Sequence, residues 1–205
     1  MTKRLIFQIR NYIINKLVNM VSEIMDKFEK KEFLNLTDKF KFIGSDINIA
    51  YPFRISGYSY ISIGNEFRAL EHLRLEAIAY YAEEAFNPII SIGNNVSVES
   101  NCHIGAIDKI IIEDGVMIAS NVYISDHFHG SITKDELVMP PAARKLSSKG
   151  PIIIKKNVWI GDSVCILSGV IVGENAIIGA NSVVTKDIPA NSVVAGVPAR
   201  VIRQL

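Results

Sequence analysis

Histidine is the side chain best suited to proton transfer near neutral pH, and the sequence contains four of them. His127 lies where a short apolar stretch, residues 121–125, runs into a long irregular segment. A side chain at this boundary would be held by a regular element on one side and remain open to a cleft on the other. These features make His127 the leading candidate for a general base.

The other histidines occupy less constrained positions. His129 lies two residues further into the irregular segment, where either an ordinary surface role or a contact to a substrate or cofactor is open. His103 directly precedes an aliphatic residue of a six-residue repeat and should point outward, and His72 lies in a degenerate part of that repeat, so both are expected to be structural. Asp126 could orient an imidazole, but neighbouring side chains on an extended chain point apart, so a backbone carbonyl is an equally good partner.

Neither cysteine is expected to act as a nucleophile or to form part of a disulfide framework. Cys102 and Cys165 both lie inside the repeat region, and two cysteines in such a chain favour a reducing compartment. Cys102 falls at an inward position, which argues against an acyl-cysteine intermediate.

The elements that must position these side chains follow a period of six residues. From residue 154 to residue 188 the sequence reads IKKNVW, IGDSVC, ILSGVI, VGENAI, IGANSV and VTKDI, and a branched aliphatic residue always holds the first position. A helix or a flat strand would not produce this spacing. A solenoid of triangular coils with six residues per side does, because each aliphatic residue then stacks on its counterpart in the next coil. The fifth position holds short side chains that suit a narrow interior: Val158, Val164, Val170, Ala176 and Ser182.

The same spacing recurs upstream with less regularity. Its aliphatic positions fall at Ile43, Ile49 and Ile55, at Ile63, Ala69 and Leu75, at Ile92, Val98 and Ile104, and at Ile112, Ile118 and Ile124. We therefore expect an all-β solenoid of about six coils over residues 41–190, interrupted by a loop insertion at residues 125–151. A long ordered insertion of this kind is typical of a binding loop. The tail, residues 191–205, leaves the repeat and should cap the open end of the solenoid.

Residues 1–40 are expected to form a separate helical segment. Apolar residues spaced by threes and fours predict a helix from residue 3 to about residue 32: Leu5, Ile6, Ile9, Ile13, Leu17, Met20, Val21, Ile24 and Met25. Four basic residues, Lys3, Arg4, Arg10 and Lys16, precede the first acidic one, Glu23. The helix could pack on its own solenoid or on a neighbouring subunit, or its basic first half could rest on anionic lipid.

Composition excludes several classes of protein. The chain has 205 residues, of which 49% are hydrophobic, and its 22 basic and 21 acidic side chains give a net charge of +1. So balanced a charge gives no reason to expect nucleic acid as a partner. There is no run of 18 apolar residues and no secretory signal pattern, so we expect a cytoplasmic protein, either in solution or peripheral to the inner face of the membrane.

Three stretches of the sequence carry a family resemblance: NVWIG at residues 157–161, IGANSVVTKDIP at residues 178–189 and AGVPARVI at residues 195–202. With them the chain resembles the left-handed β-helix acyltransferases built from hexapeptide repeats. Within these it is most similar to the galactoside, maltose and surface-polysaccharide O-acetyltransferases. The resemblance covers roughly residues 90 to 205. It implies a left-handed parallel β-helix, a homotrimer, and acetyl-CoA bound in the groove between two neighbouring prisms, with no metal.

The resemblance also implies roles for individual residues. His127 would be the catalytic base, with Glu99, Asn101, His129 and Arg144 at the acceptor. Glu99 stands where the family uses an asparagine to hold a sugar hydroxyl, so Asn101 is the alternative. Six residues would contact acetyl-CoA: Asp162 and Ala180 along the pantetheine arm, Thr185 and Lys186 near its middle, and Arg200 and Arg203 at the phosphates.

The expected reaction is direct transfer of acetyl from acetyl-CoA to a sugar hydroxyl. His127 would take the hydroxyl proton and later protonate the departing thiolate, while a backbone amide stabilises the oxyanion. The loop element PPAARKLSSKGP resembles that of capsule and O-antigen acetyltransferases, which favours a polysaccharide building block as the glycan acceptor, with Arg144 and Lys149 able to meet a phosphate. Two alternatives stay open: acetylation of a small-molecule xenobiotic such as an antibiotic, and a non-catalytic trimeric scaffold.

Overall fold

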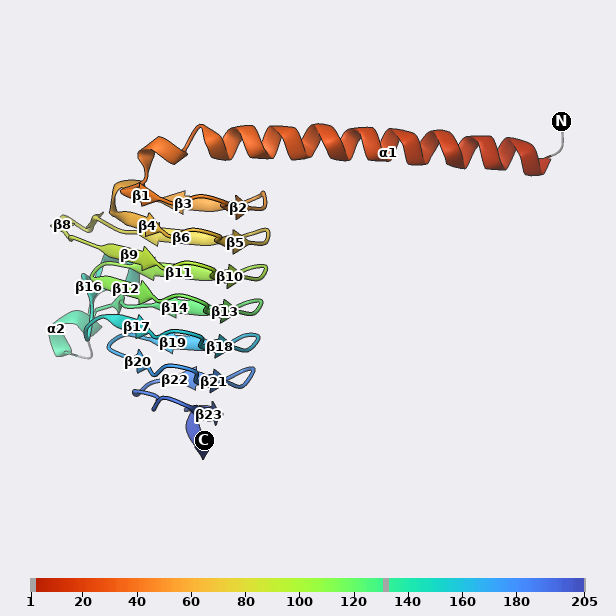
Figure 1. Ribbon diagram of the computed structural model, residues 1–205. Coiled ribbons are helices and arrows are strands. Elements are labelled where there is room, and N and C mark those ends of the chain that lie inside the picture. Colours follow the sequence, from red (N-terminus) through yellow and green to blue (C-terminus); the bar gives the residue numbers. More distant parts are fainter. Residues whose placement is uncertain (1–2, 131–132, 205) are drawn as a thin grey trace. The chain divides into compact units, whose positions relative to one another are not determined.

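The computed structural model describes residues 3–130 and 133–204, without the side chains of residues 3–6, 22, 25–26 and 28–32. The chain divides into two compact units, Met1–Asp38 and Lys39–Leu205. The second unit is a stack of triangular coils, seen from the side in Figure 1. Each coil contributes one strand to each of three sheets, which we call A, B and C in the order in which the chain visits them.

The strands of the three sheets are short and, with one exception, parallel. Sheet A contains β1 (Phe42–Ile43), β4 (Ile61–Ile63), β9 (Ile89–Ile92), β12 (Lys109–Ile112), β17 (Ile152–Ile154) and β20 (Ile171–Val172). Sheet B contains β2 (Asn48–Ile49), β5 (Arg68–Ala69), β10 (Ser97–Val98), β13 (Met117–Ile118), β18 (Trp159–Ile160), β21 (Ile177–Ile178), β23 (Ser192–Ala195) and β24 (Arg200–Gln204). Sheet C contains β3 (Arg54–Ser56), β6 (Arg74–Ala77), β11 (His103–Ala106), β14 (Tyr123–Ser125), β19 (Cys165–Leu167) and β22 (Val183–Val184).

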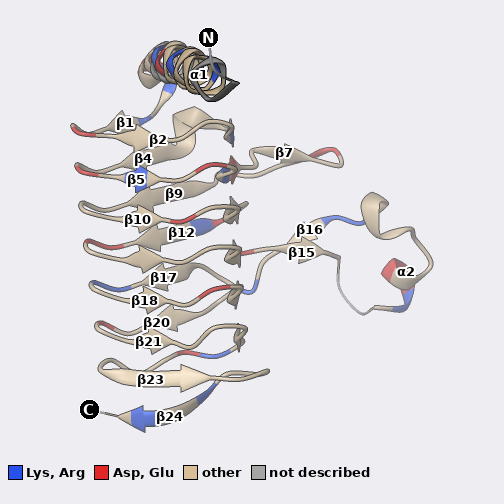
Figure 2. Cartoon of the chain, turned by 90° about the vertical axis from the view of Figure 1, so that its right-hand side faces the viewer, with Lys and Arg blue, Asp and Glu red and all other residues tan. Residues whose placement is uncertain are grey.

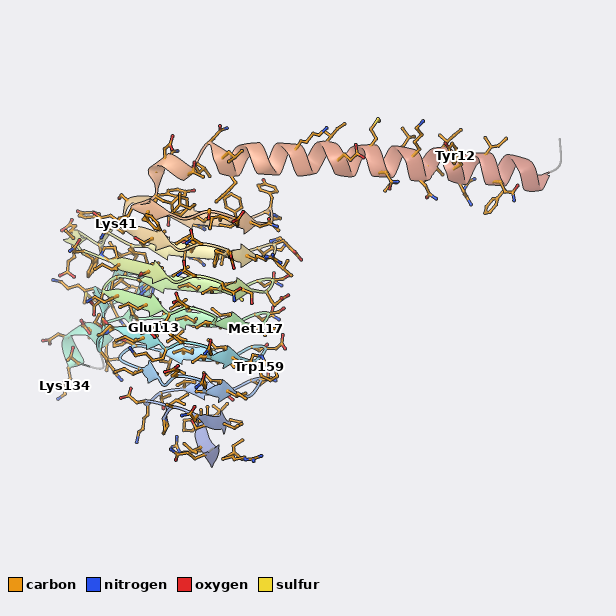
Figure 3. The ribbon with its side chains drawn as sticks, in the orientation of Figure 1. Tyr12, Lys41, Glu113, Met117, Lys134 and Trp159 are labelled. Carbon is orange, nitrogen blue, oxygen red and sulfur yellow. The ribbon has the colours of Figure 1, made fainter. Side chains whose placement is uncertain are left out.

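The aliphatic positions of the repeat form the core. In sheet C, for example, Ile104 lies beside Ile124, and Ile124 beside Ile166, each at most 1% exposed. Outward residues alternate with them, as with Met117 and Trp159, which are neighbours on the outer face of sheet B and are labelled in Figure 3. This parallel β-helix fits the architecture implied by the resemblance, because a period of six residues places one inward aliphatic residue on every side of the triangle.

The corners of the triangle require left-handed backbone. Asn101 (φ 62°), Asn121 (φ 61°) and Asn181 (φ 59°) lie at corners between sheets B and C, and Ser163 (φ 57°) occupies the corner of the coil between those of Asn121 and Asn181. Asparagine adopts this conformation more readily than most residues. His72 (φ 65°) occupies the same corner in an earlier coil, so the structure gives it a place in a turn.

The C-terminal tail differs from the expectation that it leaves the repeat. Strand β23 continues sheet B, with Val194 lying beside Ile178 in parallel, and Ile188 bridges to Val172 in sheet A. The coil is shorter here by two residues, which hides it from a search at fixed spacing. Only the last strand, β24, departs from the helix, because it turns back and pairs antiparallel with β23.

Two insertions leave the prism at the passage from sheet C to sheet A, and Figure 2 shows both on the same side. Residues 78–88 include the antiparallel pair β7 (Tyr80–Tyr81) and β8 (Glu84–Ala85). Residues 126–151 include β15 (Phe128–His129), α2 (Lys134–Leu137), a 3₁₀ turn at Pro141–Ala143 and β16 (Leu146–Ser147), which pairs antiparallel with β15. Two further 3₁₀ turns span Thr37–Lys39 and Tyr58–Tyr60.

The two insertions hold each other. The Tyr81 hydroxyl donates to the Ala142 carbonyl at 2.8 Å and lies 3.3 Å from Nδ1 of His129. Lys145 and Glu84 form an ion pair between them. The loop that begins at His127 is therefore supported by a hairpin from an earlier coil, a contact that the repeat pattern does not predict.

The first unit is dominated by the helix α1 (Lys3–Leu34), which confirms the predicted helix. Most of its described apolar side chains are exposed, including Tyr12 (labelled in Figure 3), Ile13 and Leu17, whereas Phe33 near its C-terminal end is buried. The side chains of Lys3, Arg4, Leu5, Ile6 and Met25, which entered the prediction, lie outside the described part of the chain. Within the described residues, no helix has the length and apolar character needed to cross a bilayer.

Candidate active site

His127 lies two residues beyond the end of β14, where the chain leaves sheet C. Its Nδ1 is 3.1 Å from Oδ1 of Asp126 and 3.3 Å from Oγ of Ser125. The side chain is 11% exposed, so the ring is largely enclosed while one edge remains open. A rigid strand and two oxygen atoms thus fix the position of the imidazole.

Asp126 is the anchor of this arrangement. It is completely buried, and its two carboxylate oxygens accept hydrogen bonds from the backbone amides of Ile107 (2.9 Å), Asp108 (2.9 Å) and Lys109 (2.8 Å). Of the two orienting partners that the sequence left open, Asp126 or a backbone carbonyl, it is the Asp126 carboxylate that faces Nδ1 of His127. Strand alternation ends at Ser125, and beyond it the chain turns out of the sheet, so adjacent side chains no longer have to face opposite sides.

These contacts also determine where the ring carries its proton. The Ser125 hydroxyl donates to the His127 carbonyl at 3.1 Å, so its oxygen is left as an acceptor toward Nδ1. Since the Asp126 carboxylate is an acceptor as well, Nδ1 must be the protonated nitrogen in the neutral ring. Nε2 then carries the free lone pair, which is the state a general base requires.

His127 borders a cavity of about 550 Å³. Three other residues that the sequence predicted to take part in the site, His129, Lys149 and Thr185, share this cavity with His127. Its full lining is Tyr123, Ser125, His127, Phe128, His129, Lys149, Leu167, Ser168 and Thr185. The ammonium group of Lys149 lies 5.7 Å from the centre of the Phe128 ring, so the cavity has a cation at one wall.

The remaining cofactor candidates fall into two places. Lys186 and Arg200 line a separate cavity of about 240 Å³ near the C-terminal end, and Arg203 lies on the same exposed strand as Arg200, β24. Asp162 and Ala180 lie instead at the corner between sheets B and C, where Asp162 accepts a hydrogen bond from the Ser120 amide at 3.2 Å. His127 and Thr185 lie at the other end of the sheet C strands, at the corner between sheets C and A. A single chain therefore does not bring all six predicted cofactor-binding residues to His127.

The predicted acceptor residues are dispersed in the same way. Glu99 and Asn101 lie at the corner between sheets B and C, with Asn101 forming the turn itself. Arg144 donates through Nε to the Met139 carbonyl at 3.0 Å and packs over Gly130 within the insertion, outside the lining of the His127 cavity. Of this set only His129 shares the cavity with His127.

Cys102 is unsuited to nucleophilic chemistry. It is 1% exposed and its Sγ donates to the Ala119 carbonyl at 3.1 Å. Burial raises the pKa of the Cys102 thiol to about 11, so the reactive thiolate is scarce near neutral pH.

The repeat register contains a signal that sequence reasoning overlooked. In each strand of sheet C, the residue that follows the inward aliphatic residue points outward. In the stacked coils these outward residues form a column that passes beside His127. Reading down the stack, this column contains Glu76, Gly105, Ser125 and Leu167. Ser125 and Leu167 line the cavity, and Glu76 holds a cluster of basic side chains.

Within the described ranges, no group of three or more histidine, cysteine, aspartate or glutamate side chains is placed to hold a metal ion. The site as described consists of one buried carboxylate, one oriented imidazole and a cavity.

Two parts of the chain match known families. Residues 89–126 match the family described as hexapeptide repeat of succinyl-transferase, and residues 151–186 match the family described as bacterial transferase hexapeptide (six repeats). The putative lipopolysaccharide biosynthesis O-acetyl transferase WbbJ of Escherichia coli (strain K12) is 36% identical over 160 residues, which cover 76% of this chain and 78% of WbbJ.

Two further proteins show the same likeness. Galactoside O-acetyltransferase of Escherichia coli (strain K12) is 43% identical over 121 residues, which cover 57% of this chain but only 54% of that enzyme. The crystal structure of a maltose O-acetyltransferase from Clostridium difficile 630 is 32% identical and superposes with a TM-score of 0.59, covering 88% of this chain and 77% of the other.

Proposed function

This chain belongs to the hexapeptide-repeat acetyltransferase family, and from that premise we propose that it transfers the acetyl group of acetyl-CoA to a hydroxyl of a sugar. The acceptor we propose is a building block of a surface polysaccharide. The observation that carries the proposal is the pairing of His127 with the buried carboxylate of Asp126 at the mouth of a cavity.

The chemistry follows from the proton inventory of His127. Acetyl-CoA supplies the acetyl group as a thioester. Nε2 of His127 accepts the proton of the acceptor hydroxyl while the hydroxyl oxygen attacks the thioester carbonyl carbon. The carbon–sulfur bond breaks, and the same nitrogen returns the proton to the departing sulfur. Asp126 stabilises the charged ring between these two events, because its carboxylate faces Nδ1 at 3.1 Å.

We further propose that the active unit is a homotrimer. Asp162 and Ala180 lie at one edge of sheet C, and His127 and Thr185 lie at the other. A groove between two copies would place the corner that carries Asp162 and Ala180 in one chain opposite the corner that carries His127 and Thr185 in its neighbour. Such a groove would combine the dispersed cofactor candidates in one site.

We also propose that α1 makes peripheral contact with an anionic membrane. Its exposed apolar side chains are accompanied by Arg10 and Lys16, and its first acidic residue is Glu23. Cosedimentation with vesicles of anionic lipid should retain the full chain and lose a variant in which Ile13 and Leu17 are changed to Ser. Concentration-dependent self-association without vesicle binding would point to a helix partner in place of lipid.

The test of the transfer reaction is release of free thiol from acetyl-CoA, followed with a thiol reagent over a panel of sugars, sugar phosphates and antibiotics. The proposal expects turnover with a sugar and its loss in His127→Ala. Turnover with an antibiotic alone would establish the xenobiotic alternative. Absence of both turnover and acetyl-CoA binding would leave a non-catalytic scaffold as the remaining function.

A further inference from the structure

A second cluster of charged side chains lies on the outer face of sheet C, on the coils before His127. Its centre is Glu76, whose side chain is 7% exposed. Arg74 binds the carboxylate oxygen Oε2 through Nη2 (2.6 Å) and Nε (2.7 Å). Arg54 approaches Oε1 through Nε at 3.3 Å, and Nε2 of His103 lies 3.2 Å from Oε2. One buried carboxylate therefore orients three basic side chains.

Gly105 joins this cluster to the catalytic histidine. It lies between Glu76 and Ser125 in the register of sheet C. A Cβ atom on Gly105 would lie 3.2 Å from Nε2 of His103 and 3.4 Å from Cε1 of His127. The two imidazoles thus border the same small space, which any side chain at this position would fill. A substrate group that reaches Nε2 of His127 from this side must pass over the cluster.

The charges of the cluster do not cancel. Burial, and then the positive charge of Arg74, lowers the pKa of His103, so this ring is neutral near pH 7. Burial by itself would raise the pKa of Glu76, but the hydrogen bond and charge of Arg74 outweigh it, so the carboxyl stays ionised. Two guanidinium groups therefore face one carboxylate, which leaves an excess of one positive charge.

The excess charge is directed to solvent. The Arg54 side chain is 73% exposed and the Arg74 side chain 47% exposed, although both are held by Glu76. Within the described residues, Arg54 contacts Glu76 through Nε, which leaves its two terminal nitrogens as donors. A guanidinium fixed along one edge and open along another suits bidentate recognition of a second anion.

We propose that Arg54 and Arg74, held by Glu76, bind an anionic group of the acceptor, either a phosphate or a carboxylate. The inference rests on the proposed function, because it takes His127 as the site of acetyl transfer and places the acceptor on the side of His127 on which Gly105 lies. It narrows the substrate class from sugars in general to sugar phosphates, including nucleotide sugars and lipid-linked sugar phosphates, or uronic acids. A structural ion pair would need one guanidinium, whereas this cluster supplies two.

The experiment measures binding to the full-length chain by calorimetry, with glucose 1-phosphate, glucuronic acid and glucose as probes. The anionic probe of the correct class should bind about tenfold or more tightly than glucose, which corresponds to one good charge-assisted contact. Preference for glucose 1-phosphate identifies phosphate as the recognised group, and preference for glucuronic acid identifies carboxylate. Arg54→Ala and Arg74→Ala should each remove most of that preference.

Arg68→Ala is the matched control, because Arg68 is an exposed arginine of the same coil on the outer face of sheet B. It should leave the preference intact. Arg74→Lys keeps the positive charge but loses the paired N–H donors of the guanidinium, so it should give an intermediate affinity for the anionic probe. Thermal melting checks that each variant is folded. Equal binding of the three probes, or a preference that survives both alanine substitutions, would overturn the inference. If no probe supports thiol release the proposed function fails, and calorimetry still decides whether this anion site exists.

Discussion

The corner between sheets A and B and the corner between sheets C and A both carry polar side chains, but they direct their hydrogen bonds differently. At the first corner the side chains bond to the preceding coil: the carboxamide oxygen of Asn65 accepts from the Ser45 amide (2.9 Å), that of Asn94 from the Asn65 amide (2.8 Å), and the Asp114 carboxylate from the Asn94 amide (2.8 Å). Further down, Asn175 accepts from Asn157 and donates to Asn191. This ladder satisfies the backbone of tight turns.

At the corner between sheets C and A the chain does not close tightly. Both insertions leave there, and the amides of Ile107, Asp108 and Lys109 converge on the carboxylate of Asp126. That carboxylate in turn orients the imidazole of His127. One kind of bond, an amide to a side-chain oxygen, thus stabilises a turn where the coil is regular and holds the carboxylate that orients the His127 imidazole where the coil is interrupted.

The largest expected effect is a loss of activity without a loss of stability, on substitution of His127 at the corner between sheets C and A. His127→Ala should lower the rate of acetyl transfer by about 10²- to 10⁴-fold, because it removes the proposed general base. The melting temperature should change little, since the side chain lies outside the apolar core. Thiol release and thermal melting of the same preparation measure both quantities. Transfer at the original rate by this variant would exclude His127 as the base.

Asp126→Asn should have the next largest effect on activity. The proposed base, His127, remains, but its ring loses the carboxylate that fixes its tautomer and stabilises its charged form, so we expect the rate to fall about tenfold to a hundredfold. The melting temperature should also fall, because three amides lose a charged acceptor. A variant that loses stability but keeps full activity in the folded fraction would limit Asp126 to a structural role.

Asn94→Ala tests the other side of the comparison. It removes two ladder contacts at an exposed corner, the bond accepted from the Asn65 amide and the bond donated to Asp114, so the free energy of unfolding should fall by about 1 kcal/mol. The rate of acetyl transfer should stay within about twofold of the original, since the ladder does not touch the cavity. Chemical denaturation and thiol release provide the two readouts. A large loss of activity here would mean that the corners are coupled.

The smallest expected effect is a difference in pH dependence. His103 binds a proton less readily in the folded chain than at its ordinary pKa of 6.5, so stability should begin to fall as the pH drops below 6.5. Glu76 has a folded pKa below its ordinary value of 4.5, so its contribution is present above pH 4.5 and is lost as the pH falls through the lowered pKa. Glu76→Gln should therefore flatten the curve of stability against pH below 4.5.

The ladder variant is the control for this titration. Asn94 does not titrate, so Asn94→Ala should lower stability equally at each pH and keep the acid slope. Chemical denaturation between pH 3 and pH 8, a range chosen to span both ordinary pKa values, gives the comparison. An unchanged acid slope in Glu76→Gln would show that the cluster does not contribute to it.

The sequence was sufficient for features that repeat. A branched residue at every sixth position can bury its side chain only if the chain closes into triangular coils, so the stacking of Ile104, Ile124 and Ile166 could be predicted from spacing alone. The same spacing located the insertion that follows β14, and with it His127. A helix in the first 34 residues followed from its 3.6-residue period.

Only the tertiary structure decided the contacts between residues whose separation follows no period. Asp126 meets the amides of residues 107–109 one coil away, and Tyr81 meets His129 across two insertions of different length. Glu76 gathers Arg54, Arg74 and His103 because three coils of unequal length come into register. A repeat fixes where each coil begins, but the path of an insertion depends on what it packs against, and that information is spread over the whole chain.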